Sequence, residues 1–418
     1  MIKTNKLFLN SLFIYILSLL TSGLISFISI PLIIKLYGLE LYGSFSLIQN
    51  IILIFISFGC GWLNQCILRF NNNSSNFKIT IFQLYLILIV PLSLLSFATL
   101  YFVNSNVFVI ILATITIFFG GISALSVTFY QSKFIAKKSF YFEFIRVVVF
   151  FLLIVVFYYL FSKFDNLIRL TFSFFLSYFI SFLFLLKIDF KFFVISVKMF
   201  FSKINKSYFL LFFKENKYLF HYGLPLALWF TMSSLLNVSD RYIISHYLNK
   251  EDLGIYSAVY DLLFKGITLL YAPILVAGYP ILTDKYNQNK KKVAYQFLKK
   301  LVLLEICIFV VVIIIAYFLK SYFIETIVGI PISEKSLGIV MPIIVGAFIW
   351  QLAMLVHKPL EFELKTKVML VLIVITLIVN VSLNLLFIKT YGIMFAAYST
   401  LFSAFLYLIL VILKLSFK

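Results

Sequence analysis

Long apolar runs, separated by short stretches rich in Lys, Asn and Gly, recur along the whole chain. A helix needs about 20 mostly apolar residues to cross the hydrocarbon core of a bilayer. Cutting the sequence at charge clusters and turn residues leaves twelve such segments. They cover residues 8–34, 43–68, 79–103, 106–130, 142–162, 167–187, 218–247, 253–280, 298–320, 336–357, 367–388 and 391–414. The pattern predicts an all-α polytopic membrane protein with about twelve transmembrane helices.

The composition supports the membrane class. Of the 418 residues, 63% are hydrophobic and only 12% are charged, whereas soluble domains average about 45–50% apolar and about 25% charged residues. The first apolar run is too long for the hydrophobic region of a signal peptide, so it is expected to remain as the first span.

The net charge of +20 would suggest nucleic acid as the partner of a soluble protein, but basic residues in short loops mark the cytoplasmic side of a membrane protein. Placing both termini in the cytoplasm assigns 26 Lys and Arg residues to that side and seven to the other. We therefore expect this orientation, with the lipid bilayer and no nucleic acid as partner.

A long basic stretch divides the spans six and six. This predicts an N-terminal six-helix bundle at 1–187, a basic cytoplasmic linker at 188–217 that lies on anionic lipid, and a C-terminal six-helix bundle at 218–418. The stretch from Tyr42 to Ser46 weakly resembles the stretch from Leu253 to Ser257, as a duplicated bundle would give. Chance similarity remains the alternative, because aromatic and aliphatic residues are common here.

Signatures of an enzyme or an ATP motor are absent from the sequence. It contains no GxxxxGK[ST], GxSxG or HExxH motif, and its three histidines are scattered. Cys60, Cys66 and Cys307 lie in apolar runs without a CxxC spacing, which indicates buried thiols rather than a metal site. We expect a protein that is not an enzyme and that uses no cofactor and no metal centre.

Charged residues inside two consecutive spans are the main functional signal, because such residues are costly in a bilayer. Asp240 and Arg241 lie in the seventh span, and Asp261 and Lys265 lie in the eighth. At 1.5 Å per residue, all four lie about 10–18 Å below the outer surface. They are expected to form a buried ion-pair network or the polar wall of a water-filled cavity, and the two alternatives are compatible.

Other polar residues are weaker candidates. Asn237, Asn380 and Asn384 lie inside spans, where hydrogen bonding between helices is the more common role of Asn. Arg69 and Arg146 lie at cytoplasmic span ends, where they reach the lipid headgroups or bind phosphate, for which Arg is geometrically suited.

Several short stretches resemble one transporter family. They are Pro31-Leu32-Ile33-Ile34-Lys35-Leu36-Tyr37-Gly38 with Tyr42-Gly43, Tyr222-Gly223-Leu224-Pro225, Asp240-Arg241-Tyr242-Ile243-Ile244 with Gly254-Ile255-Tyr256, and Asn380 and Asn384 with Tyr391-Gly392-Ile393 and Ala396-Ala397-Tyr398-Ser399-Thr400. Together they resemble Wzx-type O-antigen flippases of the multidrug/oligosaccharidyl-lipid/polysaccharide (MOP) superfamily. Phe395 departs from the pattern, since a small residue is expected there.

The resemblance implies a MATE-like alternating-access fold, with two six-helix bundles around a central cavity, in the bacterial inner membrane. It also implies a cargo of undecaprenyl-pyrophosphate-linked oligosaccharide, moved from the cytoplasmic to the periplasmic leaflet, with an O-antigen polymerase and a chain-length regulator as candidate partners. Arg241, Lys265, Arg69 and Arg146 are the candidate phosphate contacts, joined by Asn237, Asn380 and Asn384. Only Arg241 falls inside a matching motif. Lys265, Arg69 and Arg146 are candidates only because of their positions in the predicted spans or at their ends.

Without an ATP site, a proton or sodium gradient or downstream consumption of the cargo must drive transport. Asp240 and Asp261 are the candidate ion-coupling residues, because a buried carboxylate can exchange a proton or sodium ion for a neighbouring cation. An alternative is the export of a drug or metabolite by a related transporter. A membrane glycosyltransferase or polymerase is disfavoured, because the longest predicted outside loop is only about 15 residues, at 321–335.

Overall fold

Helices account for the secondary structure of the described residues, which contain no strand. The computed structural model describes residues 2–70, 75–104, 106–133, 135–202, 214–288, 290–363 and 365–416. These residues form two compact units, which are described separately. The first unit comprises Met1–Ser18 and Leu47–Thr231, and the second comprises Leu19–Ser46 and Met232–Lys418.

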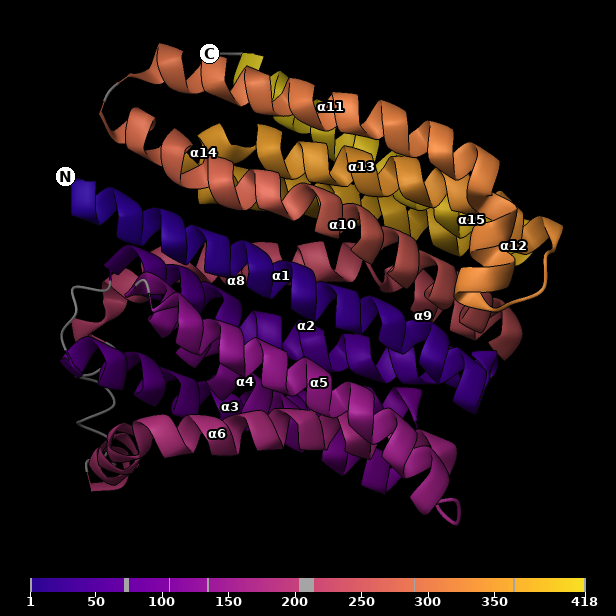
Figure 1. The fold of residues 1–418 in the computed structure, drawn as a ribbon, viewed down its shortest axis with the longest axis horizontal. Helices are drawn as coiled ribbons and strands as arrows, with labels where there is room; N and C mark the ends of the chain where they lie inside the picture. The colour runs from indigo at the N-terminus through magenta and orange to yellow at the C-terminus, as the bar shows by residue number, and fades with distance from the viewer. Residues whose placement is uncertain are drawn as a thin grey trace. The chain divides into compact units, whose positions relative to one another are not determined.

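The first unit is built on four long helices that follow one another in the sequence and pack together (Figure 1). They are α3 (Ser75–Val103), α4 (Val107–Ser132), α5 (Ala136–Leu160) and α6 (Asn166–Ser202). The unit also contains most of α2 (Leu39–Phe70) and α8 (Lys217–Leu236), and the start of α1 (Ile2–Tyr37). Gly120 and Gly121 allow α4 to contact Ile56, Tyr85 and Tyr178 closely.

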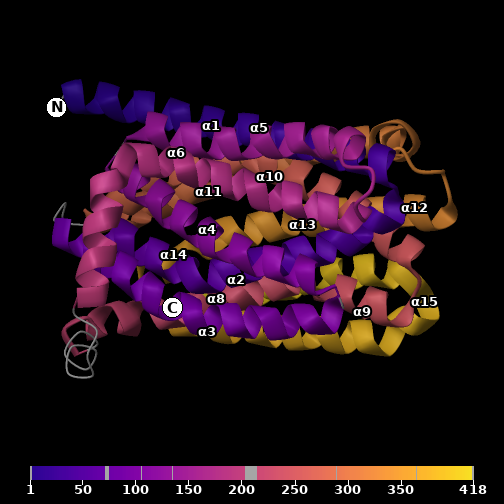
Figure 2. The same ribbon diagram turned by 90° about the horizontal axis from the view of Figure 1, so that it is seen from below.

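The second unit is organised around α13 (Val340–Val356), which packs against α10 (Lys250–Asn287), α11 (Lys291–Tyr322) and α15 (Thr366–Ser416) (Figures 1 and 2). It also contains α9 (Ser239–Tyr247), the π-helical turn η1 (Phe323–Val328), and the short helices α12 (Glu334–Gly338) and α14 (Lys358–Phe362). The end of α1 and the start of α2 belong to this unit as well. Here Gly43 and Gly254 pack backbone against backbone, because a Cβ at Gly43 would lie 2.9 Å from the Gly254 nitrogen.

The twelve predicted segments are all found in helices. Ten helices in the described part of the chain are long and apolar enough to cross a membrane. One of them, Thr366–Leu415, contains the eleventh and twelfth predicted segments, which a kink at Gly392 (φ 66°) separates as expected. The sixth segment lies in α6, which is not among the ten. The molecule is therefore an all-helical, multi-pass membrane protein.

Two predicted segments differ from the helices of the structure. The prediction of one continuous span at 218–247 is wrong, because the chain is not helical between the end of α8 and the start of α9. The predicted linker at 188–217 begins inside α6 and is described only in part, since residues 203–213 lie outside the described ranges. The proposed division into bundles at 1–187 and 218–418 stays a prediction.

Candidate functional site

The seventh predicted span is broken directly before its two charged residues. Helix α8 ends at Leu236, Val238 adopts φ −134° and ψ −10°, and α9 restarts at Ser239. The Asn237 side chain bonds to the Ser233 carbonyl oxygen at 3.0 Å, and such local bonds from Asn and Asp compete with helix propagation. Interrupted transmembrane helices commonly form binding sites, because they place free backbone groups and polar side chains inside the membrane.

The expected ion pair between the seventh and eighth spans is present. Arg241 binds Asp261 through two hydrogen bonds, Nη2 to Oδ1 at 2.7 Å and Nη1 to Oδ2 at 3.2 Å. Tyr42 from α2 donates its hydroxyl to Asp261 Oδ2 at 2.5 Å, and the ring of Tyr260 lies 5.0 Å from the guanidinium carbon. Arg241 is only 1% exposed, and its Nε–H has no hydrogen-bond partner among the residues that the structure describes. Asp261 therefore balances the charge of the buried guanidinium, but one N–H donor of the guanidinium is not used in the described structure.

Asp240 lies beside this pair and has different partners. Its Oδ1 accepts the backbone N–H of Arg241 at 2.8 Å, and its Oδ2 accepts hydroxyl protons from Tyr256 and, at 3.3 Å, from Thr400. The residue is buried. Asp240 therefore links α9 to α10 and to the C-terminal arm of α15.

A second network, made of neutral polar side chains, connects Ser239, the residue before Asp240, to both arms of α15. Asn380 Oδ1 accepts from Ser239 Oγ and from Asn384 Nδ2, each at 3.2 Å. Asn380 Nδ2 donates to Ser403 Oγ at 3.0 Å, and Ser399 donates to Asn384 Oδ1. The kink at Gly392 folds α15 back on itself, which brings residues 380 and 384 next to 399 and 403. Asn380 and Asn384 thus serve as hydrogen-bonding links between the two arms.

Lys265 and Asn237 lie at the edge of the cluster. Lys265 is partly exposed and lies one turn beyond Asp261 on the same face of α10. Asn237 is also partly exposed, and its Oδ1 accepts the hydroxyl of Tyr260 at 3.4 Å. Seven candidates therefore belong to the second unit, namely Asn237, Asp240, Arg241, Asp261, Lys265, Asn380 and Asn384. Hydrogen bonds join Arg241 to Asp240 and to Asp261, and Asn380 to Asn384.

The other two predicted arginines belong to the first unit. Arg69 is exposed, and its guanidinium lies over the Tyr222 ring at 4.6 Å. Arg146 pairs with Glu143, with 2.7 Å between Nη2 and Oε2, and stacks on Tyr178. Both therefore already have aromatic partners, and Arg146 has an acidic one as well.

The sequence did not single out the tyrosines and hydroxyls that hold the acids. Tyr42, Tyr256 and Thr400 each donate to Asp240 or Asp261. All three fall within the quoted motif stretches, so their position was a usable signal. In the described part of the chain no group of three or more His, Cys, Asp and Glu residues could hold a metal ion.

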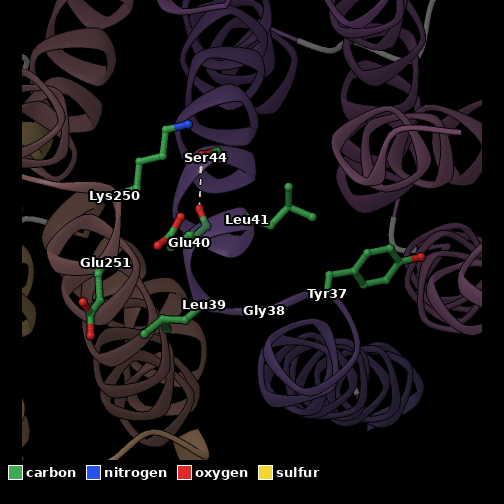
Figure 3. A pocket seen from close by; sticks show the side chains of 8 residues that line it. All are labelled: Tyr37, Gly38, Leu39, Glu40, Leu41, Ser44, Lys250 and Glu251. Atoms are coloured by element: carbon green, nitrogen blue, oxygen red, sulfur yellow. Dashed lines mark hydrogen bonds between the residues drawn. The ribbon is translucent and has the colours of Figure 1, made fainter.

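A separate hollow of about 520 Å³ lies at the α1–α2 turn and the start of α10. Tyr37, Gly38, Glu40, Lys250 and Glu251 are among its lining residues, and Figure 3 shows the charged side chains of both segments around it. Its charges are mixed, and none of the candidate residues lines it. The buried residues around Arg241 therefore stay the candidate site.

Family models match most of the chain. The model described as "Polysaccharide biosynthesis protein" matches residues 8–286, and the MatE model matches residues 225–386. No curated protein matches the sequence significantly.

Solved structures share the fold along nearly the whole chain. The lipid II flippase MurJ, in an inward closed conformation, superposes with a TM-score of 0.72 at 16% identity, over 96% of this chain and 87% of that one. A variant of the Vibrio cholerae MATE transporter VcmN gives 0.64 at 13% identity, over 100% and 99%. An inward-facing multidrug MATE transporter of the MOP superfamily gives 0.63 at 13% identity, over 96% and 94%. The chain has the MATE-like fold.

Proposed function

The chain belongs to the polysaccharide biosynthesis protein family, and from this premise we propose that it is a flippase for a lipid-linked oligosaccharide. The cargo is an oligosaccharide joined through pyrophosphate to undecaprenol, as for an O-antigen repeat unit. The protein moves it from the cytoplasmic to the periplasmic leaflet of the bacterial inner membrane. The observation that carries the proposal is a buried Arg241 in a broken helix, held by one exchangeable carboxylate.

The chemistry of this cargo requires such a site. A sugar diphosphate cannot cross about 30 Å of hydrocarbon unaided, because burying unpaired charge and polar groups is costly. The polyprenyl tail can remain in lipid while the headgroup passes. A guanidinium offers parallel N–H donors that fit phosphate oxygens, which gives Arg241 an advantage over any lysine.

Exchange of partners provides a route for binding. In the structure Asp261 accepts hydrogen bonds from both terminal nitrogens of Arg241, while Nε–H has no partner in the described part of the chain. An incoming diphosphate takes the place of Asp261 on the guanidinium. The released carboxylate is then stabilised by the hydroxyl of Tyr42 and by Lys265, one helical turn away.

The neighbouring Asp240 is the proposed coupling site. Hard cations prefer oxygen ligands, and the Asp240 carboxylate lies beside the hydroxyl oxygens of Tyr256 and Thr400. One carboxylate balances one sodium ion or one proton. Because Asp240 and Arg241 are consecutive residues, ion binding at one changes the electrostatic field at the other. Asp261 is the second candidate, through uptake of a proton when cargo displaces it.

Vesicles test the cargo class directly. The purified protein is reconstituted with undecaprenyl-pyrophosphate-linked oligosaccharide, and the fraction of glycan that becomes accessible to an external lectin is followed over time. We expect the protein to increase the rate of exposure relative to empty vesicles, and an imposed proton or sodium gradient to increase it further. Protein-containing vesicles that expose glycan no faster than empty ones contradict the proposal.

The match to the MatE model over residues 225–386 favours one alternative, the export of a drug or metabolite. The same vesicles loaded with a cationic dye distinguish the two functions. A drug exporter releases the dye under a gradient and leaves the lipid-linked glycan in place. The flippase is expected to do the reverse.

A further inference from the structure

Helix α11 contains one acidic residue in an otherwise apolar membrane segment. Between Lys291 and Tyr322 the only Asp or Glu is Glu305. On membrane-insertion scales, a charged residue at the centre of a transmembrane helix raises the free energy of insertion by about 2.5–3.5 kcal/mol. A carboxyl group at this position therefore requires an explanation.

Glu305 points into the protein and not toward lipid. Its neighbours Leu303, Leu304 and Ile306 are exposed, whereas Glu305 is only 2% exposed. It shares its buried face of α11 with Ala294 and Leu298, and this face packs against α10 and α13. The carboxyl group thus occupies a position that an apolar side chain normally fills.

The surroundings of Glu305 provide no compensating charge. Among the described residues no Lys, Arg or His forms an ion pair with it, and its Oε2 has no hydrogen-bond partner. Helix α13 contains no charged residue. On α10 the titratable neighbour is Tyr271, whose hydroxyl donates to the backbone carbonyl of Glu305 at 3.2 Å.

Five other charged groups on α10, α11 and η1 are exposed or lie further along a helix. Lys265 precedes Tyr271 by six residues, or about 9 Å along the axis of α10. Lys299 and Lys300 on α11 are exposed, as is Glu325 on η1. Asp284 is exposed near the end of α10.

Aromatic rings and one neutral polar pair complete the surroundings. Phe309 stacks on Phe348 with 3.8 Å between ring centroids, and Tyr271 lies 5.7 Å from the same ring. One turn further along both helices, Gln351 Nε2 donates to Thr268 Oγ1 at 3.0 Å. An isolated ionised carboxylate in such a place costs far more than the neutral acid.

We propose that Glu305 is a proton-binding site of this protein, separate from the Arg241 cluster. It carries a proton while it is enclosed by α10, α11 and α13, and it releases that proton when these helices move and water or a cation reaches it. Its contribution to gradient-driven transport rests on the proposed function. The bound proton itself does not.

Infrared spectroscopy detects the bound proton without any transport assay. A protonated carboxyl group has a carbonyl band that a carboxylate and an amide lack. We expect this band in the unaltered protein at neutral pH, its loss in Glu305→Gln and its displacement in Glu305→Asp, which keeps an acid on a shorter side chain. Glu325→Gln, the same exchange at an exposed position, is expected to leave the band unchanged. If Glu305→Gln does not fold, Glu305→Asp still decides, because an unmoved band overturns the assignment.

Transport in vesicles then tests the coupling. Glu305→Gln is expected to bind lipid-linked oligosaccharide normally but to lose the acceleration by an imposed proton gradient, whereas Glu325→Gln keeps it. An unchanged gradient response in Glu305→Gln overturns the coupling role. If the unaltered protein moves no glycan, the proposed function fails, while the infrared band still decides whether Glu305 holds a proton.

Discussion

Tyr42 and Asp261 are 219 residues apart in the sequence, yet the tyrosine hydroxyl donates to the carboxylate at 2.5 Å. The same Asp261 oxygen accepts Nη1 of Arg241. The start of α2 is therefore connected to the cationic site through a single carboxylate. Because Gly43 and Gly254 pack backbone against backbone one residue further along α2, this connection is supported by close helix packing.

A double-mutant cycle measures the strength of this connection. Tyr42→Phe, Asp261→Asn and the double variant are compared by unfolding in detergent, and we expect a coupling energy of about 1 kcal/mol, within the range found between membrane helices. Tyr391→Phe, at an exposed tyrosine, is the control and should be neutral. Strictly additive effects of the two substitutions would show that the hydrogen bond contributes nothing to stability.

Asp240→Asn tests the ion site, since it removes the charge but keeps the shape. We expect this variant to fold and to lose most of the response of transport to a sodium or proton gradient, because among the described residues Asp240 supplies the carboxylate that accepts the hydroxyls of Tyr256 and Thr400. Asp284→Asn, at an exposed position on α10, should keep the full response. The measurement is the ratio of transport rates with and without the gradient. An equal ratio in Asp240→Asn and the unaltered protein would refute the role of Asp240.

The contacts of Asp189 predict that the stability of the first unit depends on pH. Lys78 Nζ and Tyr130 Oη both donate to its Oδ2, at 2.8 and 2.7 Å. Burial raises the pKa of Asp189, but these hydrogen bonds and the charge of Lys78 outweigh burial and lower it. A lowered folded-state pKa stabilises the protein above the unfolded value of about 3.9, and this stabilisation is lost as pH falls below it.

The thermal unfolding midpoint in detergent checks this dependence. We expect the difference in midpoint between the unaltered protein and Asp189→Asn to be large at neutral pH and to shrink as pH falls below about 4. Asp165→Asn, at an exposed residue, controls for the general effect of acid. A difference that stays constant from neutral to acidic pH would contradict the assignment.

The membrane orientation is tested with reporter fusions. Fusions at Asn205 and Asn289, which both lie outside the described residues, are expected to report the cytoplasm. Fusions at Asn249 and Ser333, which cap α10 and α12, are expected to report the periplasm. The reason is the excess of Lys and Arg in the loops assigned to the cytoplasm. A periplasmic signal at Asn205 would overturn the predicted topology.

The spans could be predicted because length and hydropathy alone determine what crosses a bilayer. The turn at Gly392 was also predictable, because glycine adopts positive φ values without strain. The backbone at Gly392 has φ 66°. The matching depth of Asp240-Arg241 and Asp261 predicted their proximity. The break at Asn237 and Val238 was not predictable from hydropathy, because hydropathy carries no information on local hydrogen bonds such as that from Asn237 to the Ser233 carbonyl.

The individual partners within the site required the structure. Asp261 and Lys265 share a helix face, so spacing cannot show that Arg241 pairs with Asp261 through two bonds. Tyr42 and Tyr256 are two of 26 tyrosines, and their role depends on contacts between distant helices. Glu305 was overlooked because a single acid in an apolar run carries no pairing signal.

The central claim, that Arg241 recognises the diphosphate of the cargo, is tested most directly by the rate of lipid-linked oligosaccharide flipping in vesicles by Arg241→Lys. This substitution keeps the charge and leaves Asp261 paired, but it removes the parallel N–H donors. We expect a rate about tenfold lower, the equivalent of losing one hydrogen bond to a charged group. Arg169→Lys, a buried arginine of the first unit, should flip at the unaltered rate. Equal rates for Arg241→Lys and the unaltered protein would contradict the claim.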